Sequence, residues 1–253
     1  MAILTGRHAL VTGGGRGIGR AIAASLTGAG AMVTVLGRQE GALKETVAAG
    51  DAGAFVTADV TDEAAVSRAV QQAAERGAID ILIANAGGAA SMPFMKGSSQ
   101  QFRDMFELNV MGVVYATRAV LGDMVKRGFG RIVVNSSVAG LKGYAYVTAY
   151  CMAKHAAVGF VRALAQETVK SGVTVNAVCP GYVDTPMTDV SVRRIVEKTG
   201  MAEKDIRQRL ADSSPQKRLY TVDEVAALVL FLCGDAAAGI NGQALSIDGG
   251  TVV

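Results

Sequence analysis

The chain has 253 residues, of which 50% are hydrophobic and 19% are charged, so it holds enough apolar material for one large core and is not intrinsically disordered. Its 31 glycines follow no Gly-X-Y period, which excludes a collagen helix. The net charge of +3 is small and no dense Lys/Arg tail is present, so nucleic acid is not an expected partner.

The cysteines and the longest apolar run bear on the compartment. Cys151, Cys179 and Cys233 are far apart without a CxxC pair, which excludes a disulfide framework or a zinc finger and fits a reducing cytosol. The longest apolar run, 225–233, is too short to span a bilayer, and strand-like sequence begins too early to leave room for a signal peptide. We therefore expect a soluble cytoplasmic protein with no membrane segment.

Strand-like and helical patterns alternate along the whole chain. The strand-like runs are His8–Val11, Met32–Leu36, Ala54–Thr57, Ile79–Ala84, Arg131–Asn135, Val173–Val178 and Ala244–Ile247. Most of them are nearly continuous in Val, Ile, Leu and Ala, which is typical of strands buried on both faces. Helical patterns cover about 17–29, 39–49, 62–76, 99–127, 149–171 and 221–233. This alternation predicts an α/β fold with a parallel sheet, in one domain over 1–253.

A glycine-rich turn follows the first strand and opens the first helix. Glycine tolerates positive φ and lets the backbone approach a pyrophosphate, whose charge the free N–H groups of a helix start can bind. The spacing Gly13-x3-Gly17-x-Gly19 differs from GxGxxG, and a tight strand-to-helix connection is the alternative. Its place in the first βα unit favours a dinucleotide, and the missing GK[ST] disfavours a phosphotransferase. The candidate residues are Gly13, Gly15, Arg16, Gly17, Ile18 and Gly19.

The end of the second strand bears on the choice of cofactor. Sites that prefer NAD place an acid there on the ribose 2′-hydroxyl, whereas this chain has Arg38, whose guanidinium can fork onto a 2′-phosphate. Arg16 adds a second positive charge, so the sequence favours NADP(H) over NAD(H); the alternative is that both arginines face solvent. Asp59 and Val60, after the third strand, are candidates for the adenine, although Asp59 can also be an ordinary strand-end aspartate.

Tyr150 and Lys154 are four residues apart and therefore share a face of one predicted helix. A nearby ammonium favours phenolate, and lowering a tyrosine pKa from about 10 towards 7 requires roughly 4 kcal/mol. Such a tyrosine is a candidate acid/base group, although a surface pair is the common alternative. Ser137 follows the fifth strand, where its hydroxyl can hold a substrate carbonyl beside the phenol. Asn109 lies in an otherwise apolar helix and needs partners, commonly water, unless it is a satisfied structural amide.

Together these motifs resemble the NAD(P)-dependent short-chain dehydrogenase/reductase family. The matching residues, in order, are Thr12-Gly13-x3-Gly17-x-Gly19, Asn85-Ala86-Gly87, Asn109, Ser137, Tyr150-x3-Lys154 and Pro180-Gly181-x3-Thr185, and they span essentially the whole chain. The resemblance implies a Rossmann-like, doubly wound sheet of seven parallel strands, usually in a homotetramer. One departure is Ala84, where many members have asparagine.

The resemblance also implies roles for these residues. Tyr150 would be the general acid/base, Ser137 would orient the substrate, and Lys154 would bind the nicotinamide ribose and lower the tyrosine pKa. Asn109 would support a water-linked proton relay, and Thr185 would hold the carboxamide. The remaining residues implied at the cofactor are Asp59, Val60, Asn85, Ala86, Gly87, Pro180, Gly181 and Val183.

The implied reaction is hydride transfer between a nicotinamide and a carbonyl carbon. Similarity to 3-oxoacyl and polyketide ketoreductases, and of the tail to 3-hydroxybutyrate-type dehydrogenases, favours reduction of a 3-oxoacyl thioester linked to coenzyme A or a carrier protein. The alternative is a dehydrogenase of a small, cyclic or aromatic secondary alcohol or of a free 3-hydroxy acid. Candidates for the pocket wall are Ser91, Met92, Phe94, Val138, Leu141, Tyr144, Tyr146, Tyr182 and Met187, with no obvious carboxylate clamp.

The segment between the sixth strand and the last helix is longer than a normal crossover turn. We expect a strongly basic lid here, over about 187–217, because ligands bind at this edge of a parallel sheet; a solvated helical excursion is the alternative. The basic residues of the whole segment 181–220 are Arg193, Arg194, Lys198, Lys204, Arg207, Arg209, Lys217 and Arg218, against Glu197, Glu203, Asp205 and Asp212.

Other classes of function fit less well. A serine hydrolase needs a base, but His8 and His155 are the only histidines and GxSxG is missing. No HExxH or Cys/His cluster predicts a metal site. A non-catalytic dinucleotide sensor would keep the glycine turn but would not need Asn109, Ser137, Tyr150 and Lys154 together. The presence of all four disfavours this class.

Overall fold

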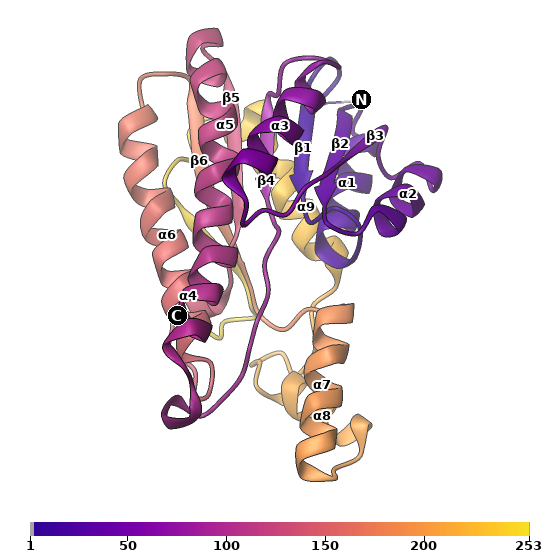
Figure 1. Cartoon of the computed structure of the whole chain (residues 1–253), viewed down its shortest axis with the longest axis vertical. Coiled ribbons are helices and arrows are strands. Elements are labelled where there is room, and N and C mark those ends of the chain that lie inside the picture. Colours follow the sequence, from indigo (N-terminus) through magenta and orange to yellow (C-terminus); the bar gives the residue numbers. More distant parts are fainter. Residues whose placement is uncertain (1–2, 253) are drawn as a thin grey trace.

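Seven parallel strands form one sheet in the order β3-β2-β1-β4-β5-β6-β7. Figure 1 shows them in the computed structural model, which describes residues 3–252. The strands are β1 (His8–Thr12), β2 (Met32–Gly37), β3 (Ala54–Thr57), β4 (Ile81–Ala84), β5 (Gly130–Asn135), β6 (Val173–Pro180) and β7 (Ala244–Ile247). Every predicted strand is present, with ends shifted by at most two residues, and the predicted doubly wound parallel fold is confirmed.

Helices cover both faces of the sheet because the strands are apolar on both sides. Every residue of β1, β4 and β6 is buried. One core cluster packs α3, α5 and α6 against the sheet, and a second packs α1, α2 and α9 against the other face. The layer helices are α1 (Gly17–Gly28), α2 (Glu40–Ala48), α3 (Glu63–Ala74), α4 (Ser99–Phe106), α5 (Gly112–Arg127), α6 (Thr148–Thr168) and α9 (Val222–Cys233).

The helical run predicted over 99–127 is not one regular helix. Between α4 and α5 the turns widen into a π-helix, η2 (Glu107–Met111), which contains Asn109. Single π turns inside helices occur often at functional sites. The whole stretch is long and apolar enough to pass a test for a membrane-crossing helix by length and composition alone. A core helix passes the same test, and here α5 packs on α3 and the sheet.

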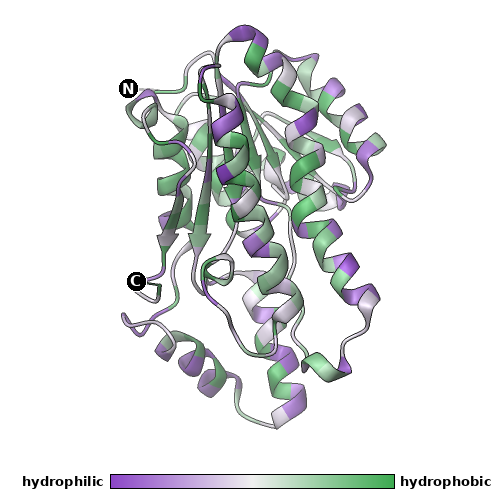
Figure 2. Cartoon of the chain, turned by 90° about the vertical axis from the view of Figure 1, so that its left-hand side faces the viewer, coloured by the Kyte–Doolittle hydropathy of each residue, from purple (hydrophilic) through white to green (hydrophobic). Residues whose placement is uncertain are grey.

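The long segment after β6 folds into two helices, α7 (Pro186–Thr199) and α8 (Glu203–Asp212), which lie apart from the layers at the carboxyl end of the sheet (Figure 1). Val192 on α7 and Ile206 on α8 are buried, while most of the other side chains of these two helices are polar, as the purple in Figure 2 shows. The predicted excess of positive charge on this segment is too large. Asp184 and Asp189 also belong to this segment, which leaves eight basic and six acidic residues over 181–220.

Candidate active site

The strand order reverses between β1 and β4, which are neighbours in the sheet. In open α/β sheets the crevice for ligands lies at the carboxyl ends of the strands at this point. The glycine turn follows β1, Asn85 follows β4, and Ser137 follows β5. Topology therefore brings three of the predicted motifs to one edge.

The glycine turn is built around the side chain of Asn85. The Asn85 Nδ2 donates to the carbonyl oxygens of Thr12 (3.0 Å) and Gly13 (3.3 Å). The Thr12 hydroxyl in turn accepts from the backbone N–H groups of Asn85 and Ala86, both at 3.0 Å. A Cβ on Gly19 would overlap both the Gly13 carbonyl and the Asn85 amide. Glycine is required at position 19 because of this close approach.

The start of α1 fits an anion. Arg16 is its N-cap residue, yet no side chain caps the helix, so the first N–H groups lack the partner that a Ser or Asp would supply. Gly13 and Gly17 adopt positive φ, at 68° and 54°, so the turn carries no side chain over these groups. The backbone geometry of this turn therefore fits a pyrophosphate, as the sequence predicts.

Arg38 and Asp59 form an ion pair with each other. Arg38 Nη1 lies 3.3 Å from Asp59 Oδ2, and the Arg38 side chain is 66% exposed. The other Asp59 oxygen accepts from the Thr61 backbone and hydroxyl, at 3.0 and 2.9 Å, and these bonds with Arg38 hold the pKa of Asp59 below its usual range despite partial burial. Arg38 thus stands at the end of β2 with part of its guanidinium free. The Val60 side chain is buried and would contact a Cβ added at Gly112.

Lys154 is buried on α6 and its ammonium donates to the carbonyl oxygen of Asn135 at 2.9 Å. The side chain of Asn135 donates to Asn85 Oδ1 at 2.8 Å, so a chain of hydrogen bonds runs from the glycine turn to the lysine. Position 87 is glycine beside it, and a Cβ there would lie 3.6 Å from the ammonium and 2.8 Å from Asn109 Oδ1. Asn135 was missed at the sequence level, because an asparagine at a strand end carries no spacing signal.

Tyr150 and Ser137 lie near each other at this edge. The pKa of Tyr150 is raised to about 12, because burial of the phenol outweighs the lowering effect of the nearby Ser137 hydroxyl. The Ser137 oxygen also accepts from the Ala139 N–H at 3.1 Å, which holds the hydroxyl at the start of η3 (Val138–Gly140). The Lys154 ammonium lies 5.7 Å from the centre of the Tyr150 ring. Burial therefore dominates the pKa of Tyr150 in the chain alone, and the expectation that Lys154 lowers this pKa stays a prediction.

Asn109 faces the core with its amide fully bonded. Its Nδ2 donates to the carbonyl oxygens of Gly88 and Met105, both at 3.0 Å, and its Oδ1 accepts from the Gly88 N–H at 3.2 Å. The side chain therefore fixes the loop after β4, which the structural alternative anticipates. Its Nδ2 also lies 3.0 Å from the Met105 sulfur.

The segment after β6 brings the remaining cofactor candidates to the same edge. Pro180 ends the strand, and the N–H of Gly181 donates to the Ile247 carbonyl at 3.0 Å. The Val183 side chain is buried in the core, and Thr185 caps α7 by accepting from the Thr188 N–H at 3.3 Å. The Thr185 methyl also lies close to the glycine turn, because a Cβ added to Gly17 would stand 3.8 Å from it.

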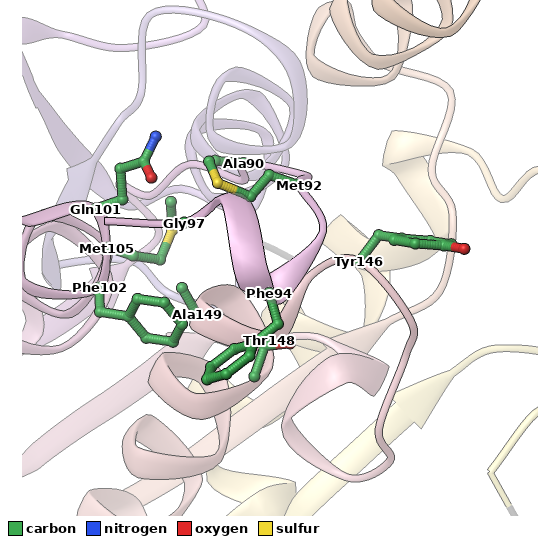
Figure 3. Close-up of a pocket in the computed structure, with 10 residues that line it drawn as sticks. All are labelled: Ala90, Met92, Phe94, Gly97, Gln101, Phe102, Met105, Tyr146, Thr148 and Ala149. Carbon is green, nitrogen blue, oxygen red and sulfur yellow. The ribbon is translucent and has the colours of Figure 1, made fainter. Parts of the chain in front are cut away.

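The pocket-wall candidates are spread over this edge. An apolar pocket lies between η1 (Phe94–Lys96), α4 and the start of α6 (Figure 3). Its lining residues are Ala90, Met92, Phe94, Gly97, Gln101, Phe102, Met105, Tyr146, Thr148 and Ala149. Outside it, Ser91, Tyr182 and Met187 are exposed, Val138 is buried, and Leu141 and Tyr144 are half-buried. The hydroxyl of Tyr144 is buried without a hydrogen-bond partner in the described chain.

Cationic groups remain free on the lid. Arg207 forms ion pairs with Asp184, Asp189 and Glu203, and Arg218 pairs with Glu224. Within residues 3–252, by contrast, no ion pair is found for the exposed cations Arg193, Arg194, Lys198, Lys204, Arg209 and Lys217. Over the same residues, no group of three or more His, Cys, Asp and Glu side chains is placed to hold a metal ion.

Known proteins share this architecture over its full length. The profile of a family described as short chain dehydrogenase matches residues 7–195. The chain is 36% identical to the 3-oxoacyl-(acyl-carrier-protein) reductase of Haemophilus influenzae, covering 98% of each chain. It is 38% identical to the acetoacetyl-CoA reductase of Shinella zoogloeoides, covering 96% of this chain and 98% of the relative.

Two solved structures are similarly close in shape. A crystal structure of a variant of actinorhodin polyketide ketoreductase with NADPH superposes with a TM-score of 0.92 at 36% identity, covering 97% of each chain. Levodione reductase superposes with a TM-score of 0.93 at 33% identity, covering 98% of each chain.

Proposed function

Because the chain belongs to the short chain dehydrogenase family, we propose that it reduces a 3-oxoacyl thioester to the 3-hydroxyacyl thioester with NADPH. As a member of this family, the chain is an oxidoreductase that interconverts keto and CH–OH groups with a nicotinamide cofactor. The observation that carries the proposal is the position of the Ser137 hydroxyl and the Lys154 ammonium beside the Tyr150 side chain, with the ammonium 5.7 Å from the centre of its ring.

When bound, the nicotinamide cofactor supplies the hydride. The Ser137 hydroxyl, whose oxygen is already held by the Ala139 N–H, donates to the substrate carbonyl oxygen and orients it. Tyr150 then donates its proton to that oxygen as negative charge develops there. Because the pKa of Tyr150 is raised to about 12, the phenol keeps its proton at neutral pH.

The chain's own groups would hold the cofactor along the sheet edge. The uncapped start of α1 and the Gly13 turn would bind the pyrophosphate. The exposed guanidinium of Arg38 supports a 2′-phosphate and hence NADPH, with Arg16 as a second cation near the turn. Lys154 has donors left for the ribose after its bond to Asn135.

The lid supports a substrate carried on an anionic handle. Its unpaired cations, including Arg193, Arg194 and Lys198 on α7, would attract the phosphates of coenzyme A or an acidic carrier protein. We also propose that the chain forms one domain in which residues 187–217 act as a lid over the site. The enzyme would be soluble and cytoplasmic.

The test of this function is consumption of NADPH, followed by its absorbance, with acetoacetyl-CoA as substrate. We expect turnover in the wild-type chain and a loss of at least about 1000-fold in Tyr150→Phe, because no other group can supply the proton. Binding of NADPH, measured by its fluorescence, should stay within about threefold. Turnover of a cyclic ketone but not of acetoacetyl-CoA would instead favour the secondary-alcohol alternative, and a near wild-type rate in the variant would exclude the role of Tyr150.

The choice of NADPH is tested separately with Arg38→Asp. Losing the fork and adding a negative charge should weaken NADPH binding by at least about tenfold while leaving NADH binding nearly unchanged. Equal effects on the two cofactors would contradict a 2′-phosphate contact. Arg103→Asp, at an exposed site on α4, is the matched control for a change of two charges.

A further inference from the structure

Tyr146 has a backbone conformation that its side chain disfavours. Its φ is +67°, and it is one of two residues other than glycine with positive φ between 3 and 252; the other is Lys217, in an exposed turn after α8. A bulky aromatic residue in this region is strained, and such strain persists only where the surroundings impose it. Tyr146 lies in the loop that joins Ser137 to the helix bearing Tyr150.

A strong hydrogen bond imposes this conformation. The carbonyl oxygen of Tyr146 accepts from the N–H of Met92 at 2.7 Å, which ties this loop to the segment after β4. The phenol ring gains little packing in return, because the residue is 64% exposed. Figure 3 shows the side chain directed away from the other nine residues of the apolar pocket. The strain therefore serves the direction of the ring rather than its burial.

The loop that carries Tyr146 lies at the edge of the sheet that holds the candidate site, because it follows β5. The loops after β5 and β6 leave adjacent parallel strands at the same edge, and the β6 loop exposes Tyr182 (43%) and Met187 (49%). Large apolar side chains gathered at an edge with polar reactive groups indicate a binding surface rather than core. A flat phenol face stacks best on another ring, with centroids about 4.5–7 Å apart.

We propose that Tyr146 is a specificity-determining residue that stacks on a ring carried by the substrate next to its reacting carbonyl. The inference rests on the proposed function and adds to it a preference, among 3-oxoacyl substrates, for those with an aromatic or cyclic group on the keto carbon. The strained backbone is what aims the phenol at that group. Removing the ring should therefore change the choice of substrate and relieve strain at once.

The test compares two β-keto esters that differ in one group, ethyl benzoylacetate with a phenyl ring and ethyl acetoacetate with a methyl. The measured quantity is the ratio of their kcat/KM values with NADPH. In Tyr146→Gly we expect the ratio to fall by about 3- to 10-fold, the usual worth of one aromatic pair. Tyr146→Phe keeps the ring and should keep the ratio.

Stability provides a second measurement of opposite sign. Glycine adopts this φ without penalty, so Tyr146→Gly should keep or raise Tm, by up to about 2–4 °C. Tyr146→Asn also tolerates positive φ but does not add a glycine to the loop. It should give the same two results, because they come from loss of the ring rather than from a more flexible loop. A merely structural tyrosine would instead lower Tm and reduce the rates with both esters equally.

The outcomes separate this inference from the proposed function. If the wild-type chain reduces neither ester nor acetoacetyl-CoA, the proposed function fails. If it reduces both esters and the ratio is unchanged in Tyr146→Gly and Tyr146→Asn, the role of Tyr146 is overturned while the function stands.

Discussion

Lys154 is a buried cation whose surroundings penalise its charge. Burial lowers the pKa of Lys154 to about 8, although its ammonium has a hydrogen bond to Asn135. Because the unfolded lysine titrates near 10.5, the folded chain binds fewer protons between pH 8 and 10.5, and this group makes the free energy of unfolding rise with pH there. At neutral pH the charged lysine thus costs stability, which is common for groups kept for function.

The same shift predicts the pH dependence of the reduction. Below pH 8 Lys154 is charged and can stabilise the oxygen that accepts the proton, whereas above it the charge is lost. We expect kcat/KM at saturating NADPH to be level near pH 7 and to fall as pH rises through about 8, well below the pKa of Tyr150. In Cys179→Ala, which removes the neighbouring thiol, the break should stay near pH 8. A level profile up to pH 10 would contradict the assignment to Lys154.

At the scale of elements, helix α1 shows what the glycine turn requires. A Cβ on Gly19 would overlap the Gly13 carbonyl and the Asn85 amide, whereas nothing lies within 4 Å of a Cβ on Gly28 at the other end of the same helix. Gly19→Ala should therefore lower the free energy of unfolding by about 1–3 kcal/mol and weaken NADPH binding at least about tenfold. Gly28→Ala, the matched control, should be neutral or stabilising by up to about 1 kcal/mol. Denaturant unfolding and cofactor fluorescence measure both.

The elements also mark how far sequence reasoning reaches. Strands such as β1 and β6 could be predicted because both faces are apolar, and the position of Ser137 follows from the strand before it. The π-helix at Asn109 could not, because apolar spacing over 99–127 is the same for a regular helix. The pKa of Tyr150 depends on burial, which spacing does not encode. The strain at Tyr146 arises from a hydrogen bond to a residue 54 positions away in the chain.

For the whole molecule, the remaining question is how its exposed apolar surfaces are covered. α5 and α6 lie side by side in Figure 1, and Val125 on α5, Met152 on α6 and Val169 at the end of α6 are exposed. β7 is an edge strand, and near it α9 exposes Phe231 (45%). Unpaired strand edges and apolar patches invite symmetric association. We propose that each of these two surfaces forms one self-complementary contact, which together would build the homotetramer that the family resemblance implies.

Size-exclusion chromatography with light scattering should therefore give a molar mass four times that of the chain. Phe231→Glu places a charge in the middle of the α9 surface, and the buried charge would cost more than the contact gains. It should halve the assembly to dimers held by the α5–α6 surface. Val190→Glu is the matched control, because Val190 is 40% exposed on α7, which belongs to neither surface, and should leave the tetramer intact. A wild-type monomer, or a tetramer that persists in Phe231→Glu, would contradict this assembly.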